Sequence, residues 1–216
     1  MKEILFQHAN LIQPIVLFTF VAVLVKHERG NVVHRFLIAI LFVSLSNEVV
    51  SYYYLTTGGK SGSFYTISVL LHNVLWLSLL SRIANLRKII LVILPLYVGF
   101  AIYNLIMLEG PDSFNFNTFT LGAILYLVLF IIESFRRLKL EQLSFFTSSN
   151  YILLCAPLLL FVFLSFIFGF KSKTLYQVKI FGDFPLYRAV TYFANVVYYT
   201  LINIYIFRRK RIDNGN

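Results

Sequence analysis

Seven long apolar runs are the feature that most constrains how this chain can fold. Each is about 20 residues long, the length that an α-helix needs to cross the hydrocarbon core of a bilayer. The runs are continuously apolar and do not alternate between apolar and polar residues, which argues against half-buried strands. They cover residues 8–26, 36–56, 64–84, 88–108, 116–136, 150–170 and 186–207. We therefore predict an all-α polytopic membrane protein with seven transmembrane helices, forming a single domain over residues 1–216.

The composition excludes an ordinary soluble domain. Of the 216 residues, 59% are hydrophobic and only 13% are charged, whereas a soluble domain has about 25% charged residues. The net charge of +10 would suggest nucleic-acid binding in a soluble protein, but here the basic residues lie at the ends of apolar runs. Positive charge in those places is expected from membrane topology and from anionic lipid headgroups. We expect the lipid bilayer as a partner and no nucleic acid.

The distribution of Lys and Arg predicts the orientation. Most of the 19 basic residues lie in the loops on one side of the predicted spans, including the cluster 208–211 after the last span. The positive-inside rule assigns that side to the cytoplasm. The N-terminus is then outside and the C-terminus cytoplasmic, as an odd number of spans requires. The long last external loop is predicted to form a small hairpin around residues 181–183.

Two ionisable residues, Glu48 and His72, lie deep inside predicted spans. An ionisable group at that depth costs several kcal/mol and is a candidate functional residue. Each lies about eight residues from the external end of its span, or about 12 Å at 1.5 Å per residue. The second and third spans are joined by a short turn and are expected to be antiparallel neighbours. A contact between Glu48 and His72 is therefore geometrically reasonable.

Other polar and aromatic side chains fall at a similar predicted level. We expect an outward-facing polar pocket lined by the second, third and seventh spans, with contributions from the first and fourth. A few convergent polar groups between aromatic walls are typical of small-ligand sites. The same side chains could instead join helices or form an interfacial belt. The candidate residues for binding a ligand or proton are Glu48, His72, Asn195, Tyr52, Trp76, Tyr199, Asn104 and Gln13.

Glu133 is interpreted differently, because it lies near the predicted cytoplasmic end of the fifth span. Arg136 and Arg137 follow within one helical turn. Residues three and four apart on a helix are neighbours. We therefore predict an interfacial salt bridge at this position and no functional site.

The sequence contains no motif for a metal or cofactor. No Gly-rich phosphate loop follows a strand, no HExxH or paired-His spacing occurs, and no GxSxG elbow is present. The single cysteine, Cys155, excludes an intramolecular disulfide and a cysteine-built metal site. We expect no cofactor and no metal, assign no catalytic residues, and favour a function other than enzymatic catalysis.

Three segments give the chain a resemblance to a group of small seven-helix inner-membrane proteins of Bacteroidetes-type bacteria. They are SNEVVSYYYL at 46–55, FNFNTFTL at 114–121 and YFANVVYYTLINIYIFRRKR at 192–211. The resemblance implies a multi-pass protein of the bacterial inner (cytoplasmic) membrane. Some of these proteins resemble the membrane-sensing parts of histidine kinase systems, which implies a sensory role by analogy. No activity is attached to the group, so it supplies no catalytic residues.

Four functions remain open. The favoured one is a sensor or receptor-like subunit that binds a small or lipidic ligand and couples to a cytoplasmic partner. Its candidate partner-binding residues are Arg208, Arg209, Lys210 and Arg211. The alternatives are a proton-coupled small-molecule transporter using Glu48 and His72, a structural or assembly subunit, and a lipid-modifying enzyme with Glu48 as general base.

Overall fold

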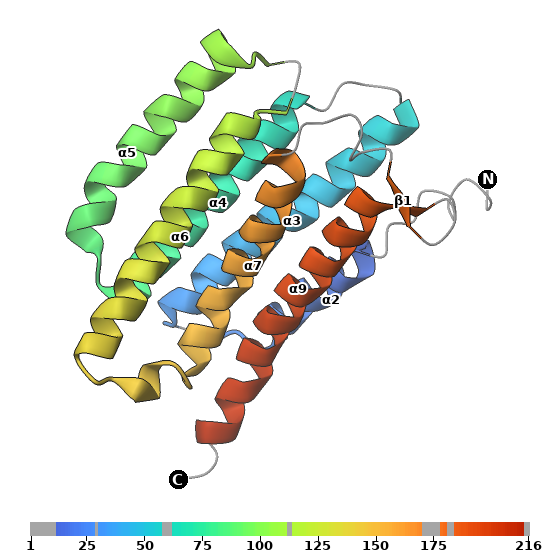
Figure 1. Ribbon diagram of the computed structural model, residues 1–216. Coiled ribbons are helices and arrows are strands. Elements are labelled where there is room, and N and C mark those ends of the chain that lie inside the picture. Colours follow the sequence, from blue (N-terminus) through green and yellow to red (C-terminus); the bar gives the residue numbers. More distant parts are fainter. Residues whose placement is uncertain are drawn as a thin grey trace. The chain divides into compact units, whose positions relative to one another are not determined.

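The computed structural model describes residues 12–28, 30–57, 62–111, 114–169, 178–180 and 184–213. Within these residues the chain forms seven α-helices, which confirms the all-α class (Figure 1). They are α2 (Ile12–Val25), α3 (Val32–Thr57), α4 (Gly62–Ala84), α5 (Arg87–Tyr103), α6 (Phe116–Lys139), α7 (Ser149–Gly169) and α9 (Leu186–Asp213).

Four short elements complete the described part of the chain. A π-helical turn, η1 (Asn104–Leu108), extends α5, and a 3₁₀ turn, η2 (Leu143–Phe145), lies between α6 and α7. Strands β1 (Lys179–Ile180) and β2 (Phe184–Pro185) pair in antiparallel fashion before α9. The predicted hairpin is thereby confirmed, although its turn residues 181–183 lie outside the described residues.

Five segments in the described part of the chain are long and apolar enough to cross a membrane. They are Val32–Tyr54, Gly62–Ala84, Arg87–Leu108, Phe116–Lys139 and Leu186–Arg208. The two remaining apolar stretches, Ile12–Val25 and Ser149–Ser165, are shorter. Five of the seven predicted spans are therefore supported by length and composition, and the chain is a multi-pass helical membrane protein.

The surface of α5 supports the same conclusion. Leu91 is 72% exposed, Leu96 is 69% exposed and Val92 is 61% exposed. Soluble monomers rarely leave large contiguous apolar patches in water. A helix with such a face is suited to contact with lipid chains.

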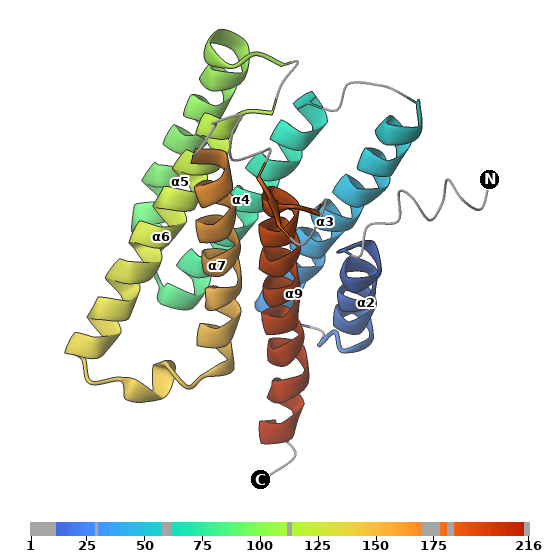
Figure 2. The same cartoon turned by 45° about the vertical axis from the view of Figure 1, so that its right-hand side comes forward.

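The chain forms two compact units, Met1–Gly122 and Ala123–Asn216, with the boundary inside α6. In the first unit α2, α3, α4 and α5 follow one another up and down, and each packs on the next (Figures 1 and 2). In the second unit α7 packs along α9. The expectation of a single domain over residues 1–216 stays a prediction.

Local backbone chemistry explains where several helices begin and end. Asn31 caps α3, because its Oδ1 accepts the backbone N–H of Val33 at 3.0 Å. Asn85 ends α4 in the left-handed region at φ 57°, and the N–H of Leu86 donates to the Ser81 carbonyl at 3.0 Å. This is the hydrogen bond of a Schellman motif, which reverses the chain sharply after a helix. These turns set α3 and α5 antiparallel to the helices that precede them.

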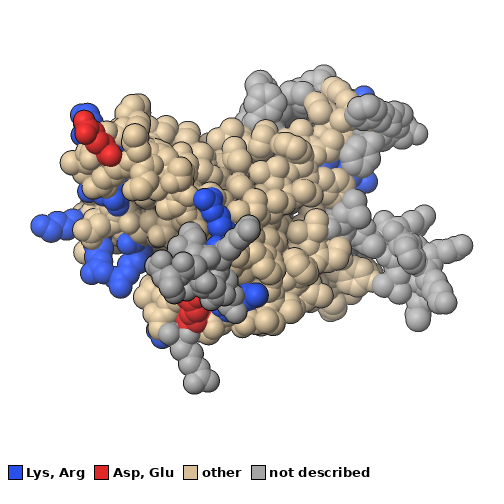
Figure 3. Space-filling view, turned by 90° about the horizontal axis from the view of Figure 1, so that it is seen from below, with Lys and Arg blue, Asp and Glu red and all other residues tan. Residues whose placement is uncertain are grey.

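Basic side chains stand mainly at helix ends. In the first unit Arg82 is in the last turn of α4, and Arg87 begins α5. In the second unit Arg136, Arg137 and Lys139 occupy the last turn of α6. In the view from below in Figure 3, Lys and Arg side chains (blue) are prominent, and few Asp or Glu side chains (red) are seen. Cationic ends on apolar helices suit the interface between lipid and water.

Candidate functional site

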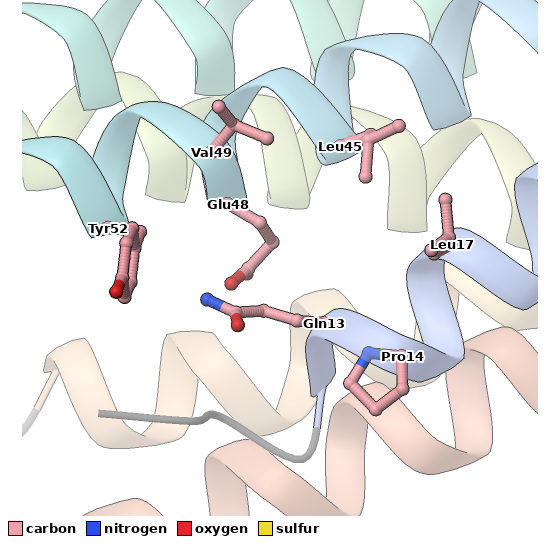
Figure 4. A pocket seen from close by; sticks show the side chains of 7 residues that line it. All are labelled: Gln13, Pro14, Leu17, Leu45, Glu48, Val49 and Tyr52. Atoms are coloured by element: carbon pink, nitrogen blue, oxygen red, sulfur yellow. The ribbon is translucent and has the colours of Figure 1, made fainter. Parts of the chain in front are cut away.

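A pocket of about 380 Å³ lies between α2 and α3 in the first unit (Figure 4). Its volume falls in the range of about 300–1,000 Å³ that is usual for small-ligand sites. The described residues that line it come from these two helices: Gln13, Pro14, Leu17, Leu45, Glu48, Val49 and Tyr52. The pocket therefore contains three of the predicted ligand-binding residues, Gln13, Glu48 and Tyr52.

The spacing of the lining residues explains how the pocket is built. On α3 they occupy positions 45, 48, 49 and 52, which form one stripe on a helix. On α2 they occupy positions 13, 14 and 17, which also share a side. Because α2 and α3 are antiparallel and joined by a short turn, the first turns of α2 face the second half of α3.

The polar centre of the pocket is the pair formed by Glu48 and Gln13. The side chains of these residues are joined by a hydrogen bond, and Figure 4 shows the Gln13 amide nitrogen pointing at the Glu48 carboxylate. Among the described residues, no Lys, Arg or His forms an ion pair with Glu48. The half-buried carboxylate has one amide donor and retains further acceptor positions, since a carboxylate offers about four.

The remaining walls of the pocket are apolar or aromatic. Leu17 and Val49 are 51% and 62% exposed, so the pocket is open rather than enclosed. Tyr52 lies one helical turn after Glu48 and lines the same pocket (Figure 4). The arrangement can hold an apolar body with a single polar group directed at Glu48.

The structure gives Glu48 and His72 different partners from those that the sequence predicted. His72 lies on α4, where its Nε2 accepts a hydrogen bond from Trp76 Nε1 at 3.3 Å. Trp76 is fully buried, and the two ring centroids are 6.3 Å apart. Glu48 is bonded to Gln13 of α2. The physical reason is the rotation of α3, whose Glu48 stripe faces α2.

Asn104 lies in a separate, buried hydrogen-bond network of the first unit. Its Nδ2 donates to Glu109 Oε2 at 2.8 Å and to Thr118 Oγ1 at 2.9 Å. Glu109 Oε2 also accepts the backbone N–H of Asn117 at 3.0 Å, in the first turn of α6. A carboxylate at a helix N-terminus is favourable because it satisfies an otherwise unbonded N–H and complements the helix dipole. Asn104 therefore holds a helix cap in place and does not line the pocket.

Tyr97 and Asn73 extend this network to α4. Asn73 Nδ2 donates to Tyr97 Oη at 2.8 Å, and Tyr97 Oη donates to the Thr118 carbonyl at 3.0 Å. A Cβ atom at Gly122 would lie 2.2 Å from Asn73 Nδ2 of α4. Helix α6 can therefore approach α4 this closely only with glycine at position 122. Tyr97 and Glu109 were not among the predicted site residues, and the polar segment 114–121 is the sequence feature that indicates polar contacts here.

The two candidates on α9, Asn195 and Tyr199, belong to the second unit. Asn195 Nδ2 donates to the Thr191 carbonyl of its own helix at 2.8 Å. The Tyr199 side chain is 4% exposed, and its ring packs edge-on against Tyr198 with centroids 4.8 Å apart. Their expected place in one pocket with Glu48 stays a prediction.

The basic residues of the second unit divide into a paired and an unassigned group. Arg136 Nε and Arg137 Nε bond Glu133 at 2.7 and 2.6 Å, which confirms the predicted salt bridge. Helix α9 continues through residues 208–211 to Asp213. The Arg208 side chain is exposed, and the side chains of Arg209, Lys210 and Arg211 lie outside the described residues. Their role in binding a partner stays a prediction.

The described part of the chain was also compared with the requirements of a metal site. No group of three or more His, Cys, Asp or Glu side chains that could hold a metal ion occurs among these residues. Cys155 has a free thiol. The chemistry that the described residues offer is hydrogen bonding and charge in the pocket between α2 and α3.

The fold and these contacts define a class, that of multi-pass helical membrane proteins. Comparisons of the chain with known protein families, with curated proteins and with solved structures find no match. The resemblance to seven-helix inner-membrane proteins therefore stays a prediction, and any functional conclusion depends on the chemistry of the pocket.

Proposed function

We propose that the protein is an integral membrane sensor or receptor-like subunit that binds a small or lipidic ligand in the pocket between α2 and α3. The observation that supports this proposal is the hydrogen-bonded pair of Glu48 and Gln13 inside a pocket with otherwise apolar or aromatic walls. A carboxylate in a membrane span costs several kcal/mol unless it is compensated. One amide compensates it only in part, and a bound ligand supplies the remainder.

In this proposal all seven helices span a bacterial inner membrane, with the N-terminus outside and the C-terminus in the cytoplasm. The basic residues at the junction of α4 and α5 and at the end of α6 support this orientation. Glu48 lies nine residues before Thr57, the last residue of α3, a distance of about 14 Å along the helix. The pocket is then in the outer half of the membrane, accessible to ligands from outside.

The signal is proposed to pass through the packing of α2 against α3. A ligand between the two helices changes their separation at the pocket, and the turn around Asn31 joins their opposite ends. In this orientation that turn is cytoplasmic. A separate cytoplasmic protein would supply the output, with Arg208, Arg209, Lys210 and Arg211 as its proposed contact.

Extraction of the protein from its native membranes tests the proposal. Val49→Trp places a large ring in the pocket, and Val92→Trp places the same ring on an exposed position of α5. Mass spectrometry of solvent extracts should find a small molecule with the wild type and with Val92→Trp, but not with Val49→Trp. Equal small-molecule content in all three preparations would contradict the proposal.

A second function, proton-coupled transport, is favoured by the absence of an ion-pair partner for Glu48 among the described residues. Such a carboxylate can exchange a proton without breaking a salt bridge. Transport predicts flux of the extracted molecule into liposomes that follows a pH gradient and is lost in Glu48→Gln. Binding without flux would leave the receptor-like function.

A further inference from the structure

We propose that the pocket selects a cationic ligand, a lipophilic ammonium compound whose nitrogen binds the Glu48 carboxylate. The apolar part of the ligand lies against Leu17, Leu45 and Val49. This inference rests on the proposed function and specifies the ligand class for the same pocket.

The charge of the Glu48 carboxylate favours a cationic ligand. Among the described residues that line the pocket, Glu48 is the one that carries a charge, and its bonded partner is a neutral amide. An anionic ligand would bring two like charges together in apolar surroundings. A wholly apolar ligand would remove water from the carboxylate without replacing the lost hydrogen bonds. An ammonium group is the head group that compensates both charge and hydrogen bonding.

The geometry of the pair is the second argument. The Gln13 amide nitrogen approaches the carboxylate from α2, which orients it (Figure 4). The hydrogen bond uses one acceptor position and leaves others available on a carboxylate that lines the pocket. An ammonium N–H can bind at those positions without displacing Gln13.

Tyr52 is the third argument. It follows Glu48 by four residues and lines the same pocket one helical turn further along α3 (Figure 4). Ammonium groups bind aromatic faces through cation–π attraction, and this attraction extends to quaternary ammonium groups that lack an N–H. The combination of a carboxylate and an aromatic ring therefore favours organic cations over other hydrogen-bond donors.

The ammonium group could belong to a free lipophilic amine or to an aminophospholipid. Both share the chemistry that Glu48 recognises. An aminophospholipid also carries a phosphate, which would approach the carboxylate as a like charge. Competition by each source distinguishes them.

The test uses the full-length protein in detergent and radiolabelled dodecyltrimethylammonium as the probe. Unlabelled dodecylamine, dodecanoate, dodecanol and phosphatidylethanolamine serve as competitors, so that the first three share one tail and differ in head group. We expect dodecylamine to compete and dodecanoate and dodecanol not to. Glu48→Gln should weaken probe binding by about tenfold or more, because the probe has no N–H and binds the carboxylate through opposite charge. Competition by phosphatidylethanolamine would identify the lipid as the source of the ammonium group.

Matched variants separate the contributions. Tyr52→Phe keeps the ring and should retain probe binding, whereas Tyr52→Leu should weaken it. Val49→Trp should abolish binding, and Val92→Trp should not. Equal competition by dodecanoate, together with unchanged binding in Glu48→Gln, would overturn the cation selectivity while Val49→Trp could still show a ligand pocket. If Val49→Trp abolishes the binding of no dodecyl compound, the cation selectivity is wrong. If, in addition, native extracts contain the same small molecules with the wild type and with Val49→Trp, the proposed function itself is wrong.

Discussion

The pocket between α2 and α3 and the hydrogen-bond network at the start of α6 contain the same chemical pair, a carboxylate with a side-chain amide. In the network, the Glu109 carboxylate accepts from the Asn104 amide and from a backbone N–H of α6. In the pocket, the Glu48 carboxylate accepts from the Gln13 amide and faces open space. The surroundings of a carboxylate–amide pair therefore determine its role. Acceptors used by the backbone stabilise the fold, and acceptors that remain available can bind a ligand.

The largest effect on stability is expected at the closest contact of the network. Gly122→Ala places a Cβ atom 2.2 Å from Asn73 Nδ2, and such overpacking costs about 1–3 kcal/mol. Thermal unfolding in detergent should show a clear decrease in Tm. Gly99→Ala is the matched control, because nothing lies within 4 Å of a Cβ atom there. An equal response at both glycines would contradict the close packing of α6.

Removal of the Tyr97 hydroxyl should have the next largest effect. Tyr97→Phe leaves Asn73 Nδ2 and the Thr118 carbonyl without the partner that joins them. A buried polar group without a partner costs about 1–3 kcal/mol, with the lower end expected inside a membrane. The control is Tyr103→Phe on the same helix, where the side chain is 54% exposed. A Tm that Tyr97→Phe leaves unchanged would show that the hydroxyl is dispensable.

The helix cap at Glu109 should contribute less. Glu109→Ala removes the acceptor for the Asn117 N–H, and loss of an N-cap acceptor costs about 0.5–2 kcal/mol. Glu109→Gln keeps an acceptor oxygen and loses the charge, so the difference in Tm between this variant and the wild type measures the interaction of the charge with the helix dipole. Identical Tm values for Glu109→Ala and the wild type would argue against a cap.

The smallest effect on stability is expected in the pocket. Glu48→Gln replaces a carboxylate by an amide of similar shape, and we expect the free energy of unfolding to change by about 0.5 kcal/mol or less, or to increase. The reason is that a binding carboxylate in a membrane span stabilises the ligand complex rather than the free protein. A Tm decrease as large as that of Tyr97→Phe would place Glu48 with the network and remove the contrast between the two regions.

The sequence predicted the helices well because their signal is local. The predicted spans 64–84 and 116–136 lie within α4 (Gly62–Ala84) and α6 (Phe116–Lys139). Continuous apolar runs define a helix without knowledge of its neighbours. The salt bridge at Glu133 was predictable for the same reason, since its partners lie three and four residues further along one helix.

The partner of Glu48 could not be predicted in this way. The spacing of 45, 48, 49 and 52 defines a stripe on α3, but the neighbour that the stripe faces depends on how the helix is rotated by tertiary packing. His72 and Gln13 are both predicted at a level similar to that of Glu48, so depth could not decide which of them is its partner. The π turn was not predicted either, because an extra residue per turn does not change the amino-acid composition of a helix. In this turn the Glu109 N–H donates to the Asn104 carbonyl at 3.0 Å.

Two properties of Glu48→Gln, measured in one preparation, show whether Glu48 serves a ligand or the fold. They are its Tm and its affinity for dodecyltrimethylammonium. If Glu48 is a binding residue, the affinity should fall by about tenfold or more while the Tm stays unchanged or rises. A lower Tm with unchanged affinity would contradict this account, because the carboxylate would then serve the fold and not a ligand.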